Sequence, residues 1–538
     1  PAERGRAARA AGHWPERLAT DYLDEALRLA PERIALTGRN SMTGQTESLD
    51  YRTLAARVDR IALGLAALGV ERGEVVSFQL PNWWQYVALY LACVRIGAVA
   101  NPLLPIYRER ELRYMLEFSE ARVAIVPAQF RGCDHARMIE ELRPGLPALR
   151  RAFAVGGEGE ASFERYFLER PWERERDAQA LFRERRPGAD ELTQIMYTSG
   201  TSGSPKGVMH TSNTLLCAPH QFIELIGLAE GDAVLMGSPM GHQTGFLYGM
   251  LMPLVLRSKL VLLDLWSAAE AGRLIESEAV SFTMGSTPFL SDLANEPSVT
   301  RASLRTLKAM VCAGAPIPSA IVRLAAERLG LRVLSAWGMT ENGAVTLTRP
   351  GAPPEKVFGT DGKAVPAMQV RVVDGAGREL PRGEAGNLQA RGAMSFVGYL
   401  KKPELNATDA DGWFETGDLA YMDADDYIRI AGRSKDVIIR GGENVPVVEI
   451  ENVLYRHPKI QDAAVVAMPD ARLGERSCAF VVTRPGETLG FAEMLEHFAA
   501  AQMAKAYWPE RLEIIAEMPR TASGKIQKFR LREIAARF

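Results

Sequence analysis

Short runs of β-branched and other apolar residues alternate with helical patterns along most of the first 350 residues. The runs predict strands: EVVSFQL (74–80), ARVAIVP (121–127), AVLMGS (233–238), KLVLLD (259–264), AVSFTM (279–284), LKAMVCAGAP (307–316) and RVLSAWG (332–338). Helices are expected between some of them, among them SAIVRLAAERLG (319–330) and a buried helix over 83–100. The alternation predicts an α/β fold in which helices flank parallel sheets.

The pattern changes twice in the last third of the chain. From Arg349, short strands separated by Gly, Pro and Asp turns predict a small antiparallel barrel or sheet, with VRVVD, GNLQARG, SFVGYL, GWFETGDLAYMD and YIRIAG as its strands. After Gly432, alternating strand and helix patterns predict a compact α+β unit of about 100 residues. We therefore expect an N-terminal part over 1–432, with a β-rich subdomain at about 349–432, and a C-terminal domain over 433–538.

Composition excludes several classes of function. The 64 Lys and Arg residues nearly balance the 66 Asp and Glu residues, so the net charge of −2 does not indicate a nucleic-acid partner. The five cysteines are far apart and form no C-x-x-C pair, which argues against disulfides and structural zinc and favours a reducing cytoplasm. The longest apolar run, GFLYGMLMPLVL (245–256), is shorter than the roughly 20 residues that span a bilayer, and predicts a buried helix.

The segment YTSGTSGSPKG (197–207) is the first candidate for chemistry. Successive glycines let backbone N–H groups converge on one point, where they bind phosphate oxygens, and the hydroxyls and Lys206 add further donors. The segment fails the Walker A pattern, because Lys206 follows Pro205 and precedes Gly207. From composition alone, a flexible surface loop is the better-supported interpretation, because Gly/Ser loops are common.

The whole set of motifs resembles the adenylate-forming superfamily, which includes acyl-CoA synthetases, beetle luciferases and peptide-synthetase adenylation domains. The other motifs follow in the family's order: PMGHQTGF (239–246), CAGAPIP (312–318), AWGMTE (336–341), TGD (416–418), GRSKDVIIRGGENV (432–445) and PRTASGKIQK (519–528). The resemblance covers the chain from about Leu49 to its end. It implies a large N-terminal adenylation domain and a small mobile C-terminal domain with a hinge at 433–436.

The resemblance implies a reaction in two steps. A carboxylate attacks the α-phosphate of ATP, pyrophosphate leaves, and the thiol of coenzyme A then displaces AMP from the acyl-adenylate. The first step concentrates negative charge at one phosphorus, so cations and oriented donors are needed there. ATP, Mg²⁺ and CoA are the cofactors and co-substrates expected.

The same resemblance assigns roles to individual residues of the nucleotide site. Glu341 is expected to hold Mg²⁺, Thr340 to contact the α-phosphate region, and Asp418 and Arg433 to bind the ribose. Trp337 is expected to stack on the adenine, where most family members carry Tyr. The β- and γ-phosphates are expected to contact Thr198, Ser199, Gly200, Thr201, Ser202, Gly203 and Lys206, and the adenine surroundings are expected to include Gly314, Ala315, Pro316, Gly338 and Met339.

The C-terminal domain is expected to supply residues for both steps. Lys525 should bridge the substrate carboxylate and the α-phosphate during adenylation, and Lys435 lies at the expected hinge. After a domain rotation, Gly441, Gly442 and Glu443 should border the pantetheine arm of CoA. His242 should border the acyl site and gate the thiol tunnel, and general-base chemistry there has little support.

The acid itself is less well defined. Adenylation domains that activate α-amino acids resemble one another in carrying Asp at the position where this chain has Gln243. The segments 283–290 and 338–345 contain no charged residue apart from Glu341. An acid with an apolar tail is expected, of medium chain length or alicyclic as in cyclohexanecarboxylate. Trp337 and Met339 favour a compact pocket.

Three hypotheses about the function remain open at this point. The first is a stand-alone acyl-CoA ligase, cytoplasmic, acting on small molecules, without nucleic-acid partners or a membrane span, and able to form a homodimer. The second is an adenylation enzyme that loads a carrier protein, or a luciferase-like relative; the lack of a carrier segment after Phe538 weakens it. The third is an inactive nucleotide- or acyl-binding relative, which the presence of Lys525, Glu341 and Asp418 argues against.

Overall fold

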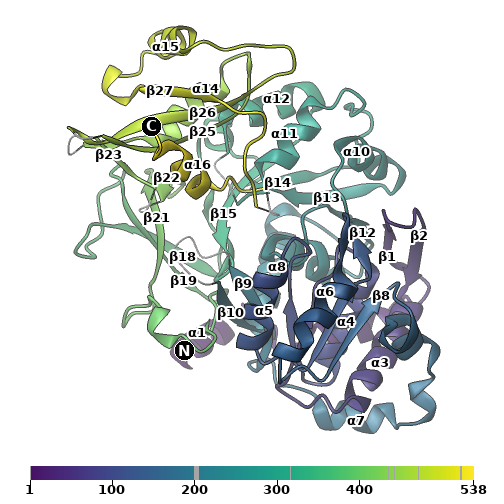
Figure 1. Cartoon of the computed structure of the whole chain (residues 1–538). Helices are drawn as coiled ribbons and strands as arrows, with labels where there is room; N and C mark the ends of the chain where they lie inside the picture. The colour runs from purple at the N-terminus through teal and green to yellow at the C-terminus, as the bar shows by residue number, and fades with distance from the viewer. Residues whose placement is uncertain are drawn as a thin grey trace.

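Two large sheets form the framework of the N-terminal part (Figure 1). The computed structural model describes residues 2–198, 205–314, 317–433, 436–440, 443–470, 472–521 and 524–538. Within these ranges the nine-stranded sheet has the order β17 (Lys363–Ala364), β16 (Gly343–Leu347), β15 (Val333–Met339), β14 (Ala309–Ala313), β13 (Val280–Gly285), β11 (Ala233–Met236), β12 (Leu260–Leu263), β1 (Ile34–Arg39) and β2 (Thr46–Asp50). The seven-stranded sheet has the order β20 (Gly398–Tyr399), β10 (Lys206–Thr211), β9 (Leu192–Thr198), β4 (Val99–Pro102), β3 (Val75–Phe78), β5 (Val123–Pro127) and β8 (Arg151–Val155).

Alternating side chains of these strands enter different cores. In β5, Val123 and Ile125 face the core shared by the two sheets, whereas Ala124 and Val126 face an outer core with α5 (Glu109–Phe118) and α6 (His135–Leu142). In β11, Val234 faces the shared core and Leu235 faces a second outer core. The shared core contains α3 (Tyr51–Ala67), α4 (Trp84–Arg95) and α8 (Ser212–Ile226), and the second outer core contains α10 (Ala268–Ser277), α11 (Thr287–Asn295) and α12 (Ser319–Leu329). Strands buried on both faces explain the continuous apolar runs in the sequence.

Two smaller sheets complete the chain. An antiparallel sheet has the order β18 (Met368–Val373), β19 (Gly386–Gly392), β21 (Phe414–Met422) and β22 (Ile428–Arg433). The C-terminal sheet contains β24 (Glu443–Val445), β23 (Ile438–Arg440), β26 (Gly474–Thr483) and β25 (Ile460–Asp470), with β27 (Arg511–Ile514) paired to β26. The helices α14 (Val447–Tyr455), α15 (Phe491–Ala500) and α16 (Lys528–Ala535) accompany it at the top of Figure 1. The predicted α/β class, with a β-rich part and an α+β C-terminal part, is confirmed.

Two element predictions need correction. The apolar stretch 83–100 is not one helix, because α4 ends at Arg95 and the strand β4 begins at Val99. A continuous apolar run is compatible with a buried helix and with a buried strand, so its pattern could not locate the boundary. SFVGYL was assigned to the antiparallel sheet, but its strand β20 pairs with β10 of the seven-stranded sheet.

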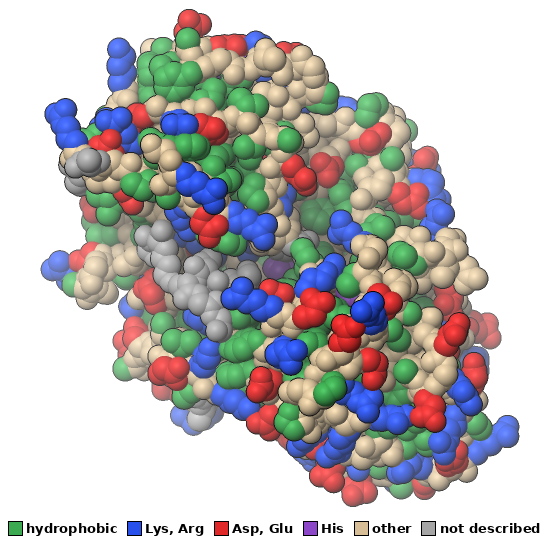
Figure 2. All heavy atoms as spheres, viewed as in Figure 1, with side chains coloured by type: hydrophobic (Ala, Val, Ile, Leu, Met, Phe, Trp, Pro, Cys, Tyr) green, Lys and Arg blue, Asp and Glu red, His purple; other side chains and the backbone are tan. Residues whose placement is uncertain are grey.

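The apolar run at 245–256 is buried and helical, as expected. A wide helical turn, η5 (Gly245–Leu251), continues into α9 (Met252–Val255). Among the described helices, none is both long enough and apolar enough to cross a membrane. Acidic and basic side chains are interspersed over the face shown in Figure 2, in keeping with the balanced charge.

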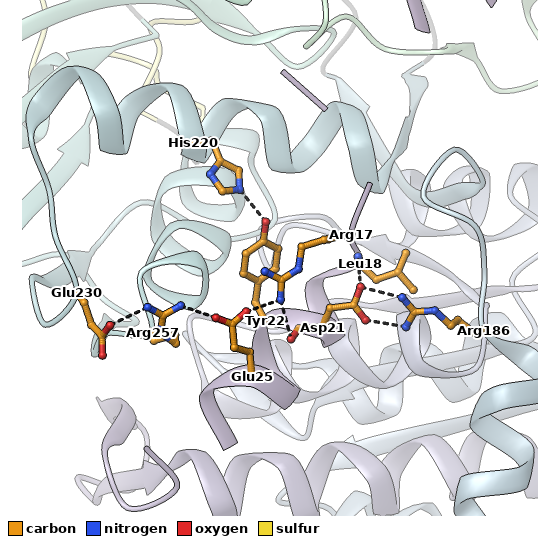
Figure 3. A network of polar contacts seen from close by, with 9 residues as sticks. All are labelled: Arg17, Leu18, Asp21, Tyr22, Glu25, Arg186, His220, Glu230 and Arg257. Carbon is orange, nitrogen blue, oxygen red and sulfur yellow. Dashed lines mark hydrogen bonds and ion pairs between the residues drawn. The ribbon is translucent and has the colours of Figure 1, made fainter. Parts of the chain in front are cut away.

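The helix α2 (Ala19–Leu29) is held by polar contacts on two sides (Figure 3). Asp21 accepts two hydrogen bonds from Arg186, at 2.7 and 2.8 Å. Glu25 pairs with Arg17 at 2.6 Å and with Arg257 at 2.8 Å. The Tyr22 hydroxyl lies 2.7 Å from Nε2 of His220 on α8. These contacts fix the residues that precede the first strand against the shared core.

Candidate active site

The candidate site lies at one edge of the nine-stranded sheet. Strands β11, β13, β14 and β15 run parallel to one another in this sheet, so their carboxyl ends meet at the same edge. Ligands of open α/β sheets bind at such edges. His242 follows β11, Gly314 follows β14, and Thr340 follows β15. Three motifs that are far apart in sequence therefore converge because of the sheet topology.

Glu341 lies in the hairpin turn between β15 and β16. Its carboxylate is buried, with a residue exposure of 5%, and its Oε1 accepts a hydrogen bond of 2.7 Å from the hydroxyl of Tyr399. The turn requires glycine at Gly338, because a Cβ there would lie 2.0 Å from the carbonyl oxygen of Gly343 on the paired strand. Among the described residues, no hydrogen bond or ion pair engages the other carboxylate oxygen of Glu341.

The segment predicted to bind phosphate joins two antiparallel strands. Thr198 ends β9 and Lys206 begins β10, and the two residues are direct partners in the register. The ammonium group of Lys206 lies 4.7 Å from the ring centre of Tyr399, a cation–π contact. Tyr399 therefore contacts both the predicted phosphate cation and the predicted metal ligand. The five residues from Ser199 to Gly203, which the sequence assigns to the phosphates, lie outside the described residues.

Asp418 and Arg433 face one another across β21 and β22. They are register partners, and Nε of Arg433 lies 3.1 Å from Oδ1 of Asp418. The other carboxylate oxygen, Oδ2, accepts a hydrogen bond of 2.8 Å from the indole Nε1 of Trp337. The hydroxyl of Thr416 accepts the amide N–H of Asp418 at 3.1 Å. The carboxylate is thus buried and oriented by donors on both oxygens.

Lys525 reaches this site from the C-terminal domain on a tight turn. The turn is closed by hydrogen bonds from Thr521 N–H to Lys525 O at 2.7 Å and from Gly524 N–H to Thr521 O at 2.9 Å. A Cβ at Gly314, whose φ is 85°, would lie 3.4 Å from Cε of Lys525. The Lys525 side chain therefore lies along the backbone at the end of β14.

The charges around Lys525 place it among the other site residues. Burial lowers the pKa of Lys525, and the neighbouring Arg433 lowers this pKa further, whereas Asp418 and Glu341 raise it. One ammonium group thus lies near both carboxylates that the sequence assigned to the nucleotide site. This arrangement is expected of a cation that stabilises a phosphate located between the ribose and the metal ion.

His242 is a neutral imidazole in this environment. Burial, followed by the positive charge of Lys525, lowers the pKa of His242 to about 3. The amide N–H of Thr244 donates to its Nδ1 at 3.3 Å, which leaves the proton on Nε2. A side chain with so low a pKa is a weak proton acceptor at neutral pH, so the geometry favours a border of the acyl site over a general base.

The structure brings most of the described candidates together. Trp337, Gly338 and Met339 end β15 beside Thr340 and Glu341, and Gly314 and Lys525 lie against each other. Glu443 begins β24 in the C-terminal sheet, where its backbone pairs with Arg440 of β23. Ala315, Pro316, Lys435, Gly441 and Gly442 lie outside the described residues.

Two functional features escaped the sequence analysis. Tyr399 was read only as part of a strand, although its hydroxyl holds Glu341. Trp337 is expected to stack on the adenine and to favour a compact pocket, and in the structure its indole N–H also holds Asp418. The signal for the second feature was the Trp that stands where most family members carry Tyr. An indole carries an N–H donor, for which a hydrogen-bond partner could have been sought.

A metal ion fits only one of these carboxylates. Within the described residues, no cluster of three or more His, Cys, Asp or Glu side chains could hold a metal. Mg²⁺ is commonly held by one or two carboxylates together with substrate phosphates and water. The buried Glu341, with one oxygen free of described partners, suits Mg²⁺ that arrives with a nucleotide.

Comparison with known proteins agrees with this geometry. Residues 23–400 match the family model described as AMP-binding enzyme, and residues 449–525 match that of the AMP-binding enzyme C-terminal domain. The medium-chain fatty-acid–CoA ligase of Escherichia coli (strain K12) is 37% identical over 534 residues, covering 99% of this chain and 93% of that protein. The 2,3-dihydroxybenzoate-AMP ligase of Bacillus subtilis (strain 168) is 32% identical over 526 residues, covering 97% and 94%.

A solved structure shows the same arrangement of the whole chain. The anthranilate CoA ligase AuaEII in complex with anthranoyl-AMP superposes with a TM-score of 0.85 at 25% identity, covering 97% of this chain and 98% of the other. The family models together span most of the chain and include His242, Glu341 and Lys525, whereas Asp418 and Arg433 lie between the two matched segments. The chain therefore belongs to the AMP-binding enzyme family and is an AMP-forming acid–CoA ligase of that family.

Proposed function

We propose that the protein activates a carboxylic acid with an apolar tail, of medium chain length or alicyclic, and transfers the acyl group to CoA. The observation that carries this proposal is the position of the Lys525 side chain against the backbone of Gly314 at the sheet edge, where its charge interacts with those of Glu341 and Asp418. The chemistry of the acid is supported by the medium-chain specificity in the name of the E. coli relative. The burial of residues 283–287, which carry no charge, agrees with an apolar tail.

In the first step, a carboxylate oxygen of the acid forms a bond to the α-phosphorus of ATP while the bond to pyrophosphate breaks. The ammonium group of Lys525 bridges the incoming carboxylate and the α-phosphate, where negative charge accumulates. Thr340 contacts the α-phosphate region, and Thr198 and Lys206 hold the departing pyrophosphate together with residues 199–203. Glu341 would hold Mg²⁺, and the bound ion would neutralise phosphate charge.

The nucleoside is held from the other side of the site. Asp418 accepts the ribose hydroxyls, and the ion pair with Arg433 orients its carboxylate. Trp337 stacks on the adenine, and its N–H fixes the second carboxylate oxygen of Asp418. The backbone at Gly314, Ala315 and Pro316 borders the base.

In the second step, the thiol of CoA attacks the acyl carbonyl, loses its proton, and AMP leaves with the phosphate oxygen. A hinge at 433–436, containing Lys435, lets the C-terminal domain rotate, so that Lys525 withdraws and Gly441, Gly442 and Glu443 approach the pantetheine arm. His242 borders the path of the thiol as a neutral ring. The two domains meet at this hinge, with 1–432 on one side and 433–538 on the other.

A carrier protein is the alternative acceptor. The B. subtilis relative is named for the adenylation step alone, as a 2,3-dihydroxybenzoate-AMP ligase, and resembles this chain over 97% of its length. CoA remains the proposed acceptor because of the E. coli relative. The five free cysteines, four of them buried, support a reducing cytoplasm as the compartment.

A panel of acids tests the proposed substrate. The purified protein is incubated with ATP, Mg²⁺ and CoA and with straight-chain acids of increasing length, cyclohexanecarboxylate and benzoate, and AMP release is measured. We expect the highest kcat/KM for medium-chain or alicyclic acids. Turnover of long-chain acids alone would contradict the proposed pocket, and pyrophosphate exchange without CoA-dependent AMP release would favour a carrier protein.

Replacing Trp337 with phenylalanine tests the hold on the ribose carboxylate. The ring that stacks is kept and the N–H donor is lost, so Oδ2 of Asp418 loses an oriented hydrogen bond. We expect the KM for ATP in pyrophosphate exchange to rise about tenfold, as for loss of one hydrogen bond to a buried charge. Trp508→Phe is the matched control, because its N–H bonds Met503 O in the C-terminal domain. Equal KM values for the two variants would exclude this role of Trp337.

A further inference from the structure

The N-terminal arm, residues 2–18, packs against the back of the candidate site. It comprises the helix α1 (Ala2–Ala10) and the segment that leads to α2. The arm lies outside the residues 23–400 that match the AMP-binding family model. In Figure 1, α1 lies beside β10 and β19, far from β1 and β2, the strands that follow it in the chain.

Two side chains of the arm donate to one short segment, residues 393–397. The indole Nε1 of Trp14 donates to the carbonyl oxygen of Ala393 at 2.9 Å, and Nη1 of Arg4 donates to the carbonyl oxygen of Phe396 at 3.0 Å. Trp14 is 8% exposed, and burial lowers the pKa of Arg4. Both donors are therefore committed to the segment rather than to solvent.

The opposite side of the same segment faces the site. The amide N–H of Phe396 donates to the carbonyl oxygen of Glu341 at 2.7 Å, and that of Val397 donates to Met209 O of β10 at 3.0 Å. Two residues further on, the hydroxyl of Tyr399 holds the Glu341 carboxylate. Phe396 thus connects the arm to the predicted metal ligand through its own N–H and C=O groups.

His210 provides a second connection. Its Nε2 lies 2.8 Å from the carbonyl oxygen of Thr340, and Nδ1 lies 3.0 Å from the hydroxyl of Thr214. Burial, with a smaller contribution from the nearby charge of Arg4, lowers the pKa of His210 to about 4, although the bond to Thr340 opposes this change. A neutral ring that donates through Nε2 holds the backbone of Thr340 in place.

The arm is itself anchored at its far end. The amide N–H of Glu16 donates to Oδ1 of Asn213 at 3.1 Å, and Nδ2 of Asn213 donates back to Oε1 of Glu16 at 3.0 Å. Arg9 forms ion pairs with Glu16 and Asp190. The network around α2 begins directly afterwards (Figure 3). The position of Arg4 and Trp14 is therefore set by the fixed core.

We propose that the N-terminal arm is a positioning element for Thr340 and Glu341, acting through residues 393–397. The inference rests on the proposed role of these two residues in binding MgATP. Arg4 and Trp14 touch neither substrate nor metal; they fix the peptide units that in turn fix the Glu341 carbonyl. A displacement of this turn moves the carboxylate relative to the phosphates, and such small displacements weaken catalysis strongly.

The experiment compares Arg4→Ala, Arg4→Lys and Trp14→Phe with Arg6→Ala, a variant of an exposed arginine on the same helix. Pyrophosphate exchange is measured against ATP, Mg²⁺ and the best acid of the panel, alongside the melting temperature. We expect Arg4→Ala to raise the half-saturating Mg²⁺ concentration and the KM for MgATP about tenfold, and Trp14→Phe about threefold, with the KM for the acid unchanged. Arg4→Lys, which keeps a cationic donor, should recover part of the loss.

The outcomes separate this inference from the proposed function. Variants that lower only the melting temperature, while the folded enzyme keeps wild-type dependence on Mg²⁺ and ATP, would overturn the positioning role alone. Equal losses for the Arg6→Ala control would do the same. Wild-type protein without pyrophosphate exchange would overturn the proposed function, and the positioning role with it.

Discussion

Replacing Lys525 with alanine is expected to reduce acid-dependent pyrophosphate exchange by roughly two to three orders of magnitude, the usual effect of losing one oriented group that stabilises transition-state charge. The side chain lies along the backbone at Gly314, with the charges of Asp418, Glu341 and Arg433 around it. Thioester formation from preformed acyl-adenylate should fall much less, because Lys525 is proposed to withdraw before that step. Both half-reactions are measured separately, by exchange and by AMP release from added acyl-adenylate.

A matched control distinguishes this role from a general effect of charge. Lys505→Ala removes an exposed lysine from the same domain and should leave both half-reactions unchanged. Equal loss of the two half-reactions in Lys525→Ala would contradict the assignment to adenylation. Retention of exchange in that variant would remove Lys525 from the chemistry altogether.

The same residue predicts the alkaline behaviour of the wild-type enzyme. Burial is the largest cause of the lowered pKa of Lys525, so its ammonium group loses its proton at a lower pH than a free lysine does. If the charged form is required, exchange is full below this pKa and declines as the pH rises through it. Thioester formation from preformed acyl-adenylate should lack this decline.

The sequence predicts the fold class and the candidate site residues, but not the contacts that support those residues. Strands such as β3, β5 and β13 were predictable because their residues are buried on both faces and most of them are apolar. Asp418, Glu341 and Lys525 were identified because each lies within a motif of several consecutive residues. A pattern of consecutive residues carries such information, because it depends on neighbours in the chain alone.

The supporting contacts depend on pairs that are distant in sequence. Tyr399 and Glu341 are separated by 58 positions, Trp337 and Asp418 by 81, and His210 and Thr340 by 130. Hydrophobic periodicity specifies which face of an element is buried, but not which side chain meets it from another sheet. The strand β20, with two residues, is also too short for any periodic signal. These contacts became visible only when the strand order was known.

Glu341→Gln should abolish most of the Mg²⁺-dependent adenylation while leaving the fold intact. Glutamine has nearly the same shape, and its side-chain oxygen can still accept the Tyr399 hydroxyl, so the buried hydrogen bond survives. The negative charge that suits Mg²⁺ is lost. We expect pyrophosphate exchange at low Mg²⁺ to fall roughly a hundredfold to thousandfold, the usual effect of removing one group that stabilises transition-state charge. Exchange should recover in part at high Mg²⁺.

Tyr399→Phe is the informative companion to this variant. It keeps the carboxylate and its charge but removes the only described hydrogen bond to Oε1, leaving a buried oxygen less well oriented. We expect about a tenfold loss, with the Mg²⁺ dependence shifted but not abolished. If Glu341 holds the metal, the effect of Glu341→Gln must exceed that of Tyr399→Phe at every Mg²⁺ concentration below saturation. A larger effect of Tyr399→Phe than of Glu341→Gln would indicate that Glu341 positions Tyr399 and Lys206, and that the metal binds elsewhere.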